Sequence, residues 1–230
     1  MPGLAQEHTF STLRYGSLQC QCAEATHAPR FVAVTGGPGA GKTAVLELAV
    51  RSFCRHVAVL PEAASIVFRG GFPRHNSGPG RRAAQRAIYR VQREVERLVM
   101  EERQVAVALC DRGTVDGLAY WPDPPQTFWS DVGSDLPAEL GRYTAVIHLG
   151  TPTVDQGYTG DPIRVESAMQ AKELDQRILT SWADHPQRML VPASADFAAK
   201  ALAALEMIRS QLPPCCLSHS LDIEEAGAVN

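Results

Sequence analysis

Short apolar stretches alternate with longer segments of helical spacing through most of the chain. Each apolar stretch has the continuous hydrophobicity of a strand that is buried on both faces of a sheet. Five such strands are expected, at residues 31–34, 56–60, 105–110, 145–149 and 189–191. Because helical segments separate them, the strands are predicted to be parallel rather than joined as hairpins.

The segments between these strands carry apolar residues at every third or fourth position, which predicts helices with one buried face. Helices are expected at residues 44–54, 61–68, 81–103 and 163–182, with a last helix capped by Ser194. Residues 70–80 are rich in Gly, Pro, Asn and Ser and predict a loop. Residues 123–141, which contain Pro and Trp, predict a long connection.

Strands that alternate with helices predict an α/β fold, in which a parallel sheet carries helices on both faces. The ligand site of such a sheet lies at the carboxyl ends of its strands. We expect this domain to span residues 30–212, between a flexible N-terminal arm at 1–29 and a flexible C-terminal tail at 213–230.

The composition is that of an ordinary globular protein, with 45% hydrophobic residues and a formal net charge of −3. This charge offers no global attraction to nucleic acid or to an anionic membrane, so neither is expected as a partner. No apolar run reaches the roughly 18 residues that span a bilayer. Residues 1–10 lack the pattern of a secretory signal, and none of the six cysteines lies in a paired zinc-binding spacing. A reduced, cytoplasmic location is therefore expected.

One segment between the first strand and the first helix matches the phosphate-binding pattern G-x-x-x-x-G-K-[ST]. Its residues are Gly36, Gly37, Pro38, Gly39, Ala40, Gly41, Lys42 and Thr43. The glycines allow successive backbone N–H groups to converge on an anion at the positive end of the following helix. Lys42 adds a charge at the β- and γ-phosphates, and the Thr43 hydroxyl is placed to ligate Mg²⁺. This P-loop predicts a site for a nucleoside triphosphate, ATP or GTP, with Mg²⁺.

Asp111 directly follows the apolar strand 105–110. A carboxylate there is placed to hold the magnesium ion, although an aspartate at this point also suits a helix cap or a turn. Hydrolysing motors usually carry a glutamate next, to activate water, but here Arg112 follows. An arginine cannot act as a base, whereas it can stabilise charge on a phosphoryl group during transfer. The pair favours phosphoryl transfer to an acceptor over a mechanical ATPase.

Glu62 follows the second strand, 56–60. If that strand neighbours 105–110, Glu62 and Asp111 emerge side by side near the γ-phosphate. One carboxylate then serves the metal and the other orients or deprotonates an acceptor hydroxyl. The alternative is a first-turn glutamate that is favoured by the helix dipole.

Arg164 follows a Gly-Tyr-Thr-Gly stretch at residues 157–160. It is expected either on a lid that brings a cation onto the phosphates or at an ordinary capped helix start. One histidine and four arginines are not expected to take part in the predicted chemistry. His148 lies inside a predicted strand and is expected in the core, and four arginines on one helix face are expected to be exposed. These are Arg86, Arg90, Arg93 and Arg97.

Four pieces of the chain together resemble a known family. They are residues 35–43, the Leu-Pro-Glu-Ala-Ala run at 60–64, residues 111–120, and Arg164-Val165-Glu166 with the helix that follows. With these pieces the chain resembles the short AAA-type P-loop proteins that are grouped with ribosylnicotinamide kinase, close to the nucleoside and nucleotide kinases. The resemblance covers about residues 30–210. It departs from the kinases in lacking an obvious paired-arginine lid.

The resemblance implies a three-layer P-loop NTPase fold whose five-stranded parallel sheet has the kinase-type order 2-3-1-4-5. It implies a phosphate site at residues 36–43, a metal-side acid at Asp111 and an acceptor-side acid at Glu62. It also implies phosphate contacts for Arg112 and Arg164. It does not name the acceptor.

Two functions follow from this pattern. The first is an ATP-dependent, Mg²⁺-dependent kinase of a small hydroxylated metabolite or nucleoside. The second is a nucleotide-gated binding or regulatory protein with little turnover of its own. An oligomeric AAA+ motor fits less well, because the chain has no room for the usual helical lid domain. The pattern leaves the acceptor, the preferred base and the oligomeric state open.

Overall fold

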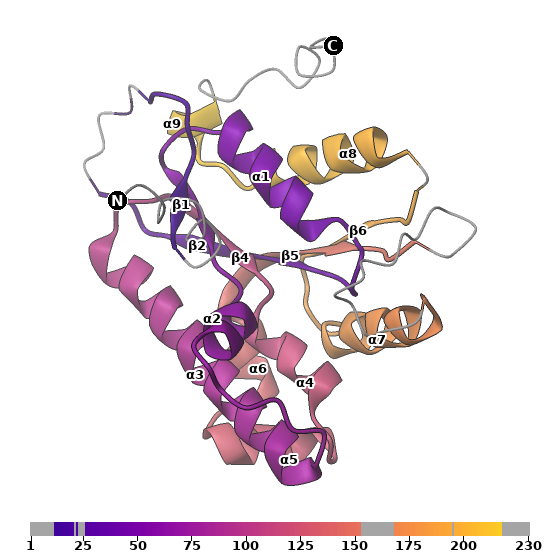
Figure 1. The fold of residues 1–230 in the computed structure, drawn as a ribbon. Coiled ribbons are helices and arrows are strands. Elements are labelled where there is room, and N and C mark those ends of the chain that lie inside the picture. The colour runs from indigo at the N-terminus through magenta and orange to yellow at the C-terminus, as the bar shows by residue number, and fades with distance from the viewer. Residues whose placement is uncertain (1–11, 21, 23–25, 153–167, 195, 218–230) are drawn as a thin grey trace, which may run out of the picture.

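A six-stranded sheet between two layers of helices organises the chain. The computed structural model describes residues 12–20, 22, 26–152, 168–194 and 196–217 (Figure 1). In spatial order the strands are β1 (Arg14–Tyr15), β3 (Val57–Leu60), β4 (Val107–Asp111), β2 (Arg30–Thr35), β5 (Tyr143–Leu149) and β6 (Arg188–Val191). Among the described residues, none of the helices combines the length and the apolar character needed to cross a membrane.

The five strands β3, β4, β2, β5 and β6 pair in parallel, and their spatial order is the one that the resemblance implied. The sheet differs from the expectation by one strand, because β1 pairs antiparallel with β3 through Arg14 opposite Val59. The sheet is therefore mixed, and part of the segment expected to be a flexible arm belongs to it. A strand of two residues is too short to leave a periodic pattern in the sequence.

One face of the sheet is covered by α1 (Lys42–Ser52) and α8 (Phe197–Arg209), and the short α9 (Pro214–Leu217) lies beside the C-terminal end of α1 (Figure 1). Fully buried Leu46 and Ile208 pack there against the strand residues Val32 and Leu109. The expected cap at Ser194 was wrong. Asp196 caps α8, because its carboxylate accepts hydrogen bonds from the amides of Ala198 and Ala199 in the first turn of the helix.

The other face carries more helices (Figure 1). They are α2 (Ala63–Arg69), α3 (Gly78–Glu102), the 3₁₀ turn Thr114–Asp116, α4 (Gly117–Tyr120), α5 (Pro125–Val132), α6 (Leu136–Leu140) and α7 (Ala168–Ser181). The stretch 123–141 is thus mostly helical rather than an open connection. Each of its two helices has a proline in its first turn, where the missing N–H costs nothing, and fully buried Phe128 anchors α5 in the core.

Candidate functional site

The P-loop connects the carboxyl end of β2 to the first turn of α1, as the sequence predicted. Its backbone takes left-handed or related angles at three glycines, with φ of +135° at Gly36, +76° at Gly39 and +90° at Gly41. A Cβ on Gly36 would lie 2.2 Å from the carbonyl oxygen of Leu149 on the neighbouring strand. The loop can therefore curl this tightly against β5 only with glycine at that position.

The first turn of α1 presents unpaired backbone donors. Gly41 is the N-cap and supplies no capping side chain, and the first turn holds no acidic residue. Within the described part of the chain, the amides of Gly39, Gly41, Lys42 and Thr43 have no backbone hydrogen-bond partner. Free amides and the positive end of the helix dipole together suit an anion at this place.

Lys42 folds back over the P-loop. Its Nζ donates to the carbonyl oxygens of Gly36 and Gly37, each at 2.9 Å. Burial and the nearby Arg112 guanidinium lower the pKa of Lys42 to about 7, although Asp111 and Glu62 act in the opposite direction. Negative charge delivered to the loop would favour the ammonium form, so protonation of Lys42 is coupled to anion binding.

Asp175 on α7 holds the P-loop in place through hydrogen bonds, and no pattern in the sequence indicates this role. Its carboxylate accepts hydrogen bonds from the amide of Gly37 at 2.6 Å and from the amide of Thr151 at 3.3 Å. It also lies 3.0 Å from Nε2 of His148, which is buried in β5 as expected. Burial alone would raise the pKa of Asp175, but the hydrogen bonds from His148 and Gly37 outweigh it and lower the pKa.

The Gly37 amide therefore points at a carboxylate, whereas the sequence interpretation had successive loop amides converge on the anion. A side chain on Gly37 would meet Oγ1 of Thr151 at 2.5 Å and Cβ of Asp175 at 2.9 Å. This glycine thus allows the loop to lie close against α7. Its amide holds the loop in place and is not available to a ligand in this arrangement.

Lys200 on α8 is the second support that sequence reasoning missed. Its Nζ donates to the carbonyl oxygens of Ala40 at 2.8 Å and Gly150 at 2.6 Å. Only 5% of the residue is exposed, and burial lowers the pKa of its amine. The one available signal was a lysine among the small and apolar residues of Phe197–Arg209, in a chain with few lysines.

Glu62, Asp111 and Arg112 come together beside the P-loop. Since β3 pairs with β4 through Leu60 opposite Cys110, the residues that follow the two strands emerge at the same edge. Arg112 donates from Nε to Oε1 of Glu62 at 2.9 Å and from Nη1 to the carbonyl oxygen of Gly36 at 3.1 Å. It therefore joins the predicted acceptor-side acid to the phosphate loop.

The two carboxylates at this edge differ in proton affinity. Burial and the negative charge of Glu62 raise the pKa of Asp111 to about 6. Burial alone would also raise the pKa of Glu62, but Arg112 and a hydrogen bond from the Ser65 hydroxyl at 2.6 Å lower it. Glu62 therefore stays ionised at neutral pH, while Asp111 lies close to its titration range.

A tight turn after β4 sets the direction of Arg112. The residue has φ of +70°, in the left-handed region that non-glycine residues seldom adopt. Asp116 fixes the turn by accepting hydrogen bonds from the amide of Gly113 at 2.8 Å and from the hydroxyl of Thr35. Arg164, which the sequence also suggested, lies outside the described residues.

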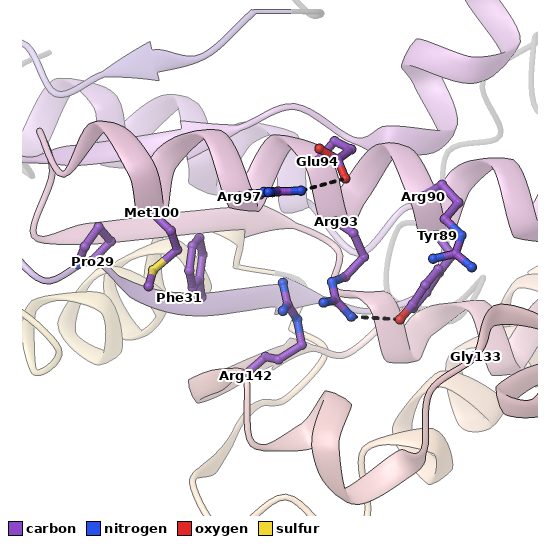
Figure 2. A pocket seen from close by; sticks show the side chains of 10 residues that line it. All are labelled: Pro29, Phe31, Tyr89, Arg90, Arg93, Glu94, Arg97, Met100, Gly133 and Arg142. Atoms are coloured by element: carbon purple, nitrogen blue, oxygen red, sulfur yellow. Dashed lines mark hydrogen bonds and ion pairs between the residues drawn. The ribbon is translucent and has the colours of Figure 1, made fainter.

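Three arginines of α3 line a cavity near the amino-terminal end of β2, whereas the P-loop follows the carboxyl end of that strand. This cavity of about 560 Å³ is bordered by Phe31, by the arginines Arg90, Arg93 and Arg97, and by Arg142 (Figure 2). Arg93 bonds to the buried Glu139, and Arg97 pairs with Glu101. Arg86 pairs in turn with Asp131. Arg86, Arg90 and Arg97 are exposed, as expected of that face, and Arg93 is half-buried.

A family model described as an AAA domain matches residues 31–200, which is most of the chain and runs from β2 into α8. The chain belongs to this AAA domain family. The AAA domain includes the whole P-loop, Glu62, Asp111 and Arg112, and the protein is accordingly a nucleotide-binding P-loop protein. A comparison with curated proteins gives no match.

Proposed function

We propose that this AAA domain is a Mg²⁺-dependent phosphotransferase that moves the γ-phosphoryl group of ATP to a hydroxyl group of a small metabolite or nucleoside. The observation that carries the proposal is the position of Arg112, whose guanidinium bridges the Glu62 carboxylate and the Gly36 carbonyl of the P-loop. A hydrolysing motor would use the corresponding place for an acid that activates water. A cation there instead suits charge on a transferring phosphoryl group.

In this proposal residues 36–43 bind the triphosphate. The unpaired amides of Gly39, Gly41, Lys42 and Thr43, together with the ammonium of Lys42, supply the positive charge. Asp175 and Lys200 do not contact the nucleotide. They hold the loop against α7 and α8, so that the amides are already oriented before the ligand arrives.

Thr43 and Asp111 are the proposed magnesium ligands. The Thr43 side chain is exposed at the first turn of α1, and Asp111 ends β4 at the same edge of the sheet. Two carboxylates that repel each other, Asp111 and Glu62, suit a divalent cation with oxygen ligands, because the cation relieves their repulsion. When bound, Mg²⁺ would neutralise charge on the β- and γ-phosphates.

Glu62 orients the acceptor hydroxyl and receives its proton as the new bond between oxygen and the γ-phosphorus forms. The bond from the γ-phosphorus to the β–γ bridging oxygen breaks, and ADP leaves with the electron pair of that bond. Arg112 and, by the family resemblance, Arg164 stabilise the phosphoryl oxygens during the transfer. The resemblance to the ribosylnicotinamide kinase group makes a nucleoside the first acceptor to examine.

A second candidate function is a nucleotide-gated binding protein with little turnover. It is favoured by the state of Glu62, whose carboxylate is held by both Arg112 and Ser65 and whose pKa is lowered. A carboxylate of low pKa is a weak base. In this alternative, nucleotide binding rearranges the Arg112–Glu62 pair and changes a surface that a partner recognises.

The two functions are separated by measuring ADP release from Mg·ATP with and without a panel of nucleosides and sugars. The kinase predicts that ADP release depends on one acceptor class. Glu62→Gln should bind ATP as tightly as the unmodified chain and lose transfer, whereas Glu94→Gln, at an exposed glutamate on α3, should retain both. Slow ADP release that no acceptor stimulates would reject the kinase. Equal loss of binding and transfer in Glu62→Gln would assign that residue a structural role.

A further inference from the structure

Four side chains of metal-binding type meet beside the amino-terminal end of β3. They are Cys20, Cys54, His56 and Cys216. Cys54 and His56 precede β3, which begins at Val57, whereas the P-loop follows the carboxyl end of the parallel strand β2. The group therefore lies at the opposite edge of the strands from the nucleotide site and is independent of it.

Three distant parts of the chain supply these residues. The segment after β1 brings Cys20, because Leu18 forms a bridge with Cys54 and its carbonyl oxygen accepts the amide of Arg55 at 3.1 Å. The turn between α1 and β3 supplies Cys54 and His56. The short helix α9 supplies Cys216. The cluster thus joins the two ends of the described chain to the edge of the sheet.

The distances within the cluster suit a tetrahedral metal. One ligand atom from each of the four residues lies within 4.8 Å of all the others. Sγ of Cys216 and Nδ1 of His56 are 3.6 Å apart. Tetrahedral zinc, with metal–sulfur bonds of about 2.3 Å and metal–nitrogen bonds of about 2.0–2.1 Å, separates such a sulfur and nitrogen by about 3.5 Å. Small side-chain movements would bring the remaining ligands to bonding distance.

The surroundings select the kind of metal. Cys54 and Cys216 are each only 1% exposed, His56 is 5% exposed, and Cys20 is half-buried. Ala106 packs against the two buried cysteines and closes one side. Thiolates and imidazole are soft or borderline ligands that suit zinc and exclude magnesium or calcium, and a closed set of four protein ligands is typical of a structural site.

We propose that Cys20, Cys54, His56 and Cys216 form a structural zinc site that fastens the segment after β1 and the helix α9 to the sheet. β1 has two residues and α9 has four, so neither brings many hydrogen bonds of its own. A bound zinc ion would supply the stabilisation that these short elements lack, because metal binding to a folded arrangement adds to its stability. Cys20, Cys54 and Cys216 are not in disulfides, so no bond to another sulfur keeps them from a metal ion.

A second group, Cys22, His27 and His56, overlaps the first through His56. Sγ of Cys22 lies 3.9 Å from Nε2 of His27, and the two imidazole rings are 4.6 Å apart. This group offers three ligands rather than four and would compete for His56. We assign the zinc to the four-residue set and give Cys22 and His27 the role of covering the outer face of His56.

The spacing along the chain explains why the sequence did not reveal this site. Cys54 and His56 are separated by one residue, while Cys216 lies 160 residues beyond His56. Sequence patterns for zinc depend on two close pairs at a fixed separation. Here only the fold brings the ligands together.

The first test uses the unmodified chain. Purified with reductant and excess Zn²⁺ and then dialysed, it should retain one equivalent of zinc per chain. With Co²⁺ in place of zinc it should give the intense visible bands of tetrahedral cobalt with thiolate ligands. X-ray absorption of the zinc form should show three sulfur neighbours and one nitrogen. Absence of stoichiometric metal, or a mass that reports a disulfide among these cysteines, would overturn the proposal.

Variants assign the ligands. Cys54→Ser and Cys216→Ser should weaken Co²⁺ binding by more than the roughly 10–100-fold that loss of an outer-shell partner costs. Cys215→Ser is the matched control, because it changes a neighbouring thiol on the same helix outside the four-residue set. His56→Cys should still bind cobalt, with a spectrum for four thiolates. Unchanged metal affinity in Cys54→Ser would reject the assignment, and loss in Cys22→Ser alone would point to the overlapping group.

ATP binding provides the check on folding. Because the cluster lies at the opposite end of the strands from the P-loop, a folded Cys216→Ser chain should still bind ATP. A variant that keeps ATP binding and loses zinc supports the proposal. The proposal is contradicted if the unmodified chain contains no metal and the Cys216→Ser variant nevertheless unfolds, because Cys216 then stabilises the fold without a metal ion.

Discussion

Arg112 donates a hydrogen bond from Nε to Oε1 of Glu62 at 2.9 Å, which joins the residue after β4 to the residue before α2. The sequence predicted these two residues as separate members of a phosphoryl-transfer site. Their contact means that the charge of one controls the chemistry of the other. Arg112 is the largest of the influences that lower the pKa of Glu62.

Replacing Arg112 should therefore change both the rate and its pH dependence. Arg112→Ala should reduce phosphoryl transfer by about 10²–10³-fold, the usual cost of removing one group that stabilises transition-state charge. Without Arg112 the pKa of Glu62 rises, so the acidic limb of the rate profile should move to higher pH. A pH–rate profile of each variant measures the lower rate and the shifted acidic limb. Arg112→Gly is the comparison variant, because glycine accepts the φ of +70° at this position without strain. Unchanged rates in both variants would contradict the role.

Nucleotide affinity should fall as the pH rises through the pKa of Lys42, which is about 7 in the free protein. Phosphate charge favours the ammonium form, so the bound state holds a proton that the free state loses above this pH. Affinity should decline by up to about tenfold per pH unit above it, the limit for uptake of one proton. Calorimetry in buffers of different ionisation enthalpy would measure the uptake. Lys42→Arg keeps its charge and should give a flatter profile.

Asp175→Asn should destabilise the protein by roughly 1–3 kcal/mol at neutral pH, because the buried amides of Gly37 and Thr151 lose a charged acceptor. The folded pKa of Asp175 lies below its ordinary 3.8. The stabilisation is therefore fully present above about pH 4–5 and is lost as the pH falls below that range. Urea unfolding at neutral and acidic pH measures both effects. The exposed Asp184→Asn is the control, and equal changes in the two variants would count against the prediction.

Lys200→Met should leave the carbonyl oxygens of Ala40 and Gly150 without their charged donor. We expect a loss of about 1.5–3 kcal/mol in unfolding free energy, the range for hydrogen bonds to charged groups. Nucleotide affinity should fall as well, because the P-loop is held less firmly. Lys172→Met, at an exposed position on α7, should behave like the unmodified chain. A fully stable Lys200→Met chain would show that the amine does not support the loop.

Much of the fold follows directly from the sequence. Buried parallel strands are continuous apolar runs, so the strands β2, β3, β4, β5 and β6 could be anticipated from the residues. Their spatial order was expected only from the resemblance to the P-loop family. The strand β1 and the helix α6 could not be anticipated, because elements of two and five residues are too short to show a period. The helix α5, of eight residues, lies in a Pro-containing stretch that the sequence pattern assigned to a connection. Their formation depends on the tertiary contacts that cover them.

The residues of the candidate site also differ in whether the sequence could predict them. The P-loop and the acid after β4 are local patterns, in which neighbouring residues carry the chemistry, and both were predictable. Asp175 reaches Gly37 across 138 residues, and Lys200 reaches Ala40 across 160. Nothing around Asp175 in the sequence distinguishes it from an ordinary polar helix position, and the only signal at Lys200 is a lysine among small and apolar residues. Only the packing of α7 and α8 on the sheet gives them their partners.

Titration calorimetry of the folded chain with ATP or GTP in the presence of Mg²⁺ measures whether residues 36–43 capture a nucleoside triphosphate. We predict binding of one nucleotide per chain, with the affinity strongly reduced in Lys42→Ala and retained in the exposed-site variant Lys172→Met. Absence of heat from both nucleotides with the unmodified chain, or equal binding by Lys42→Ala, would contradict the account.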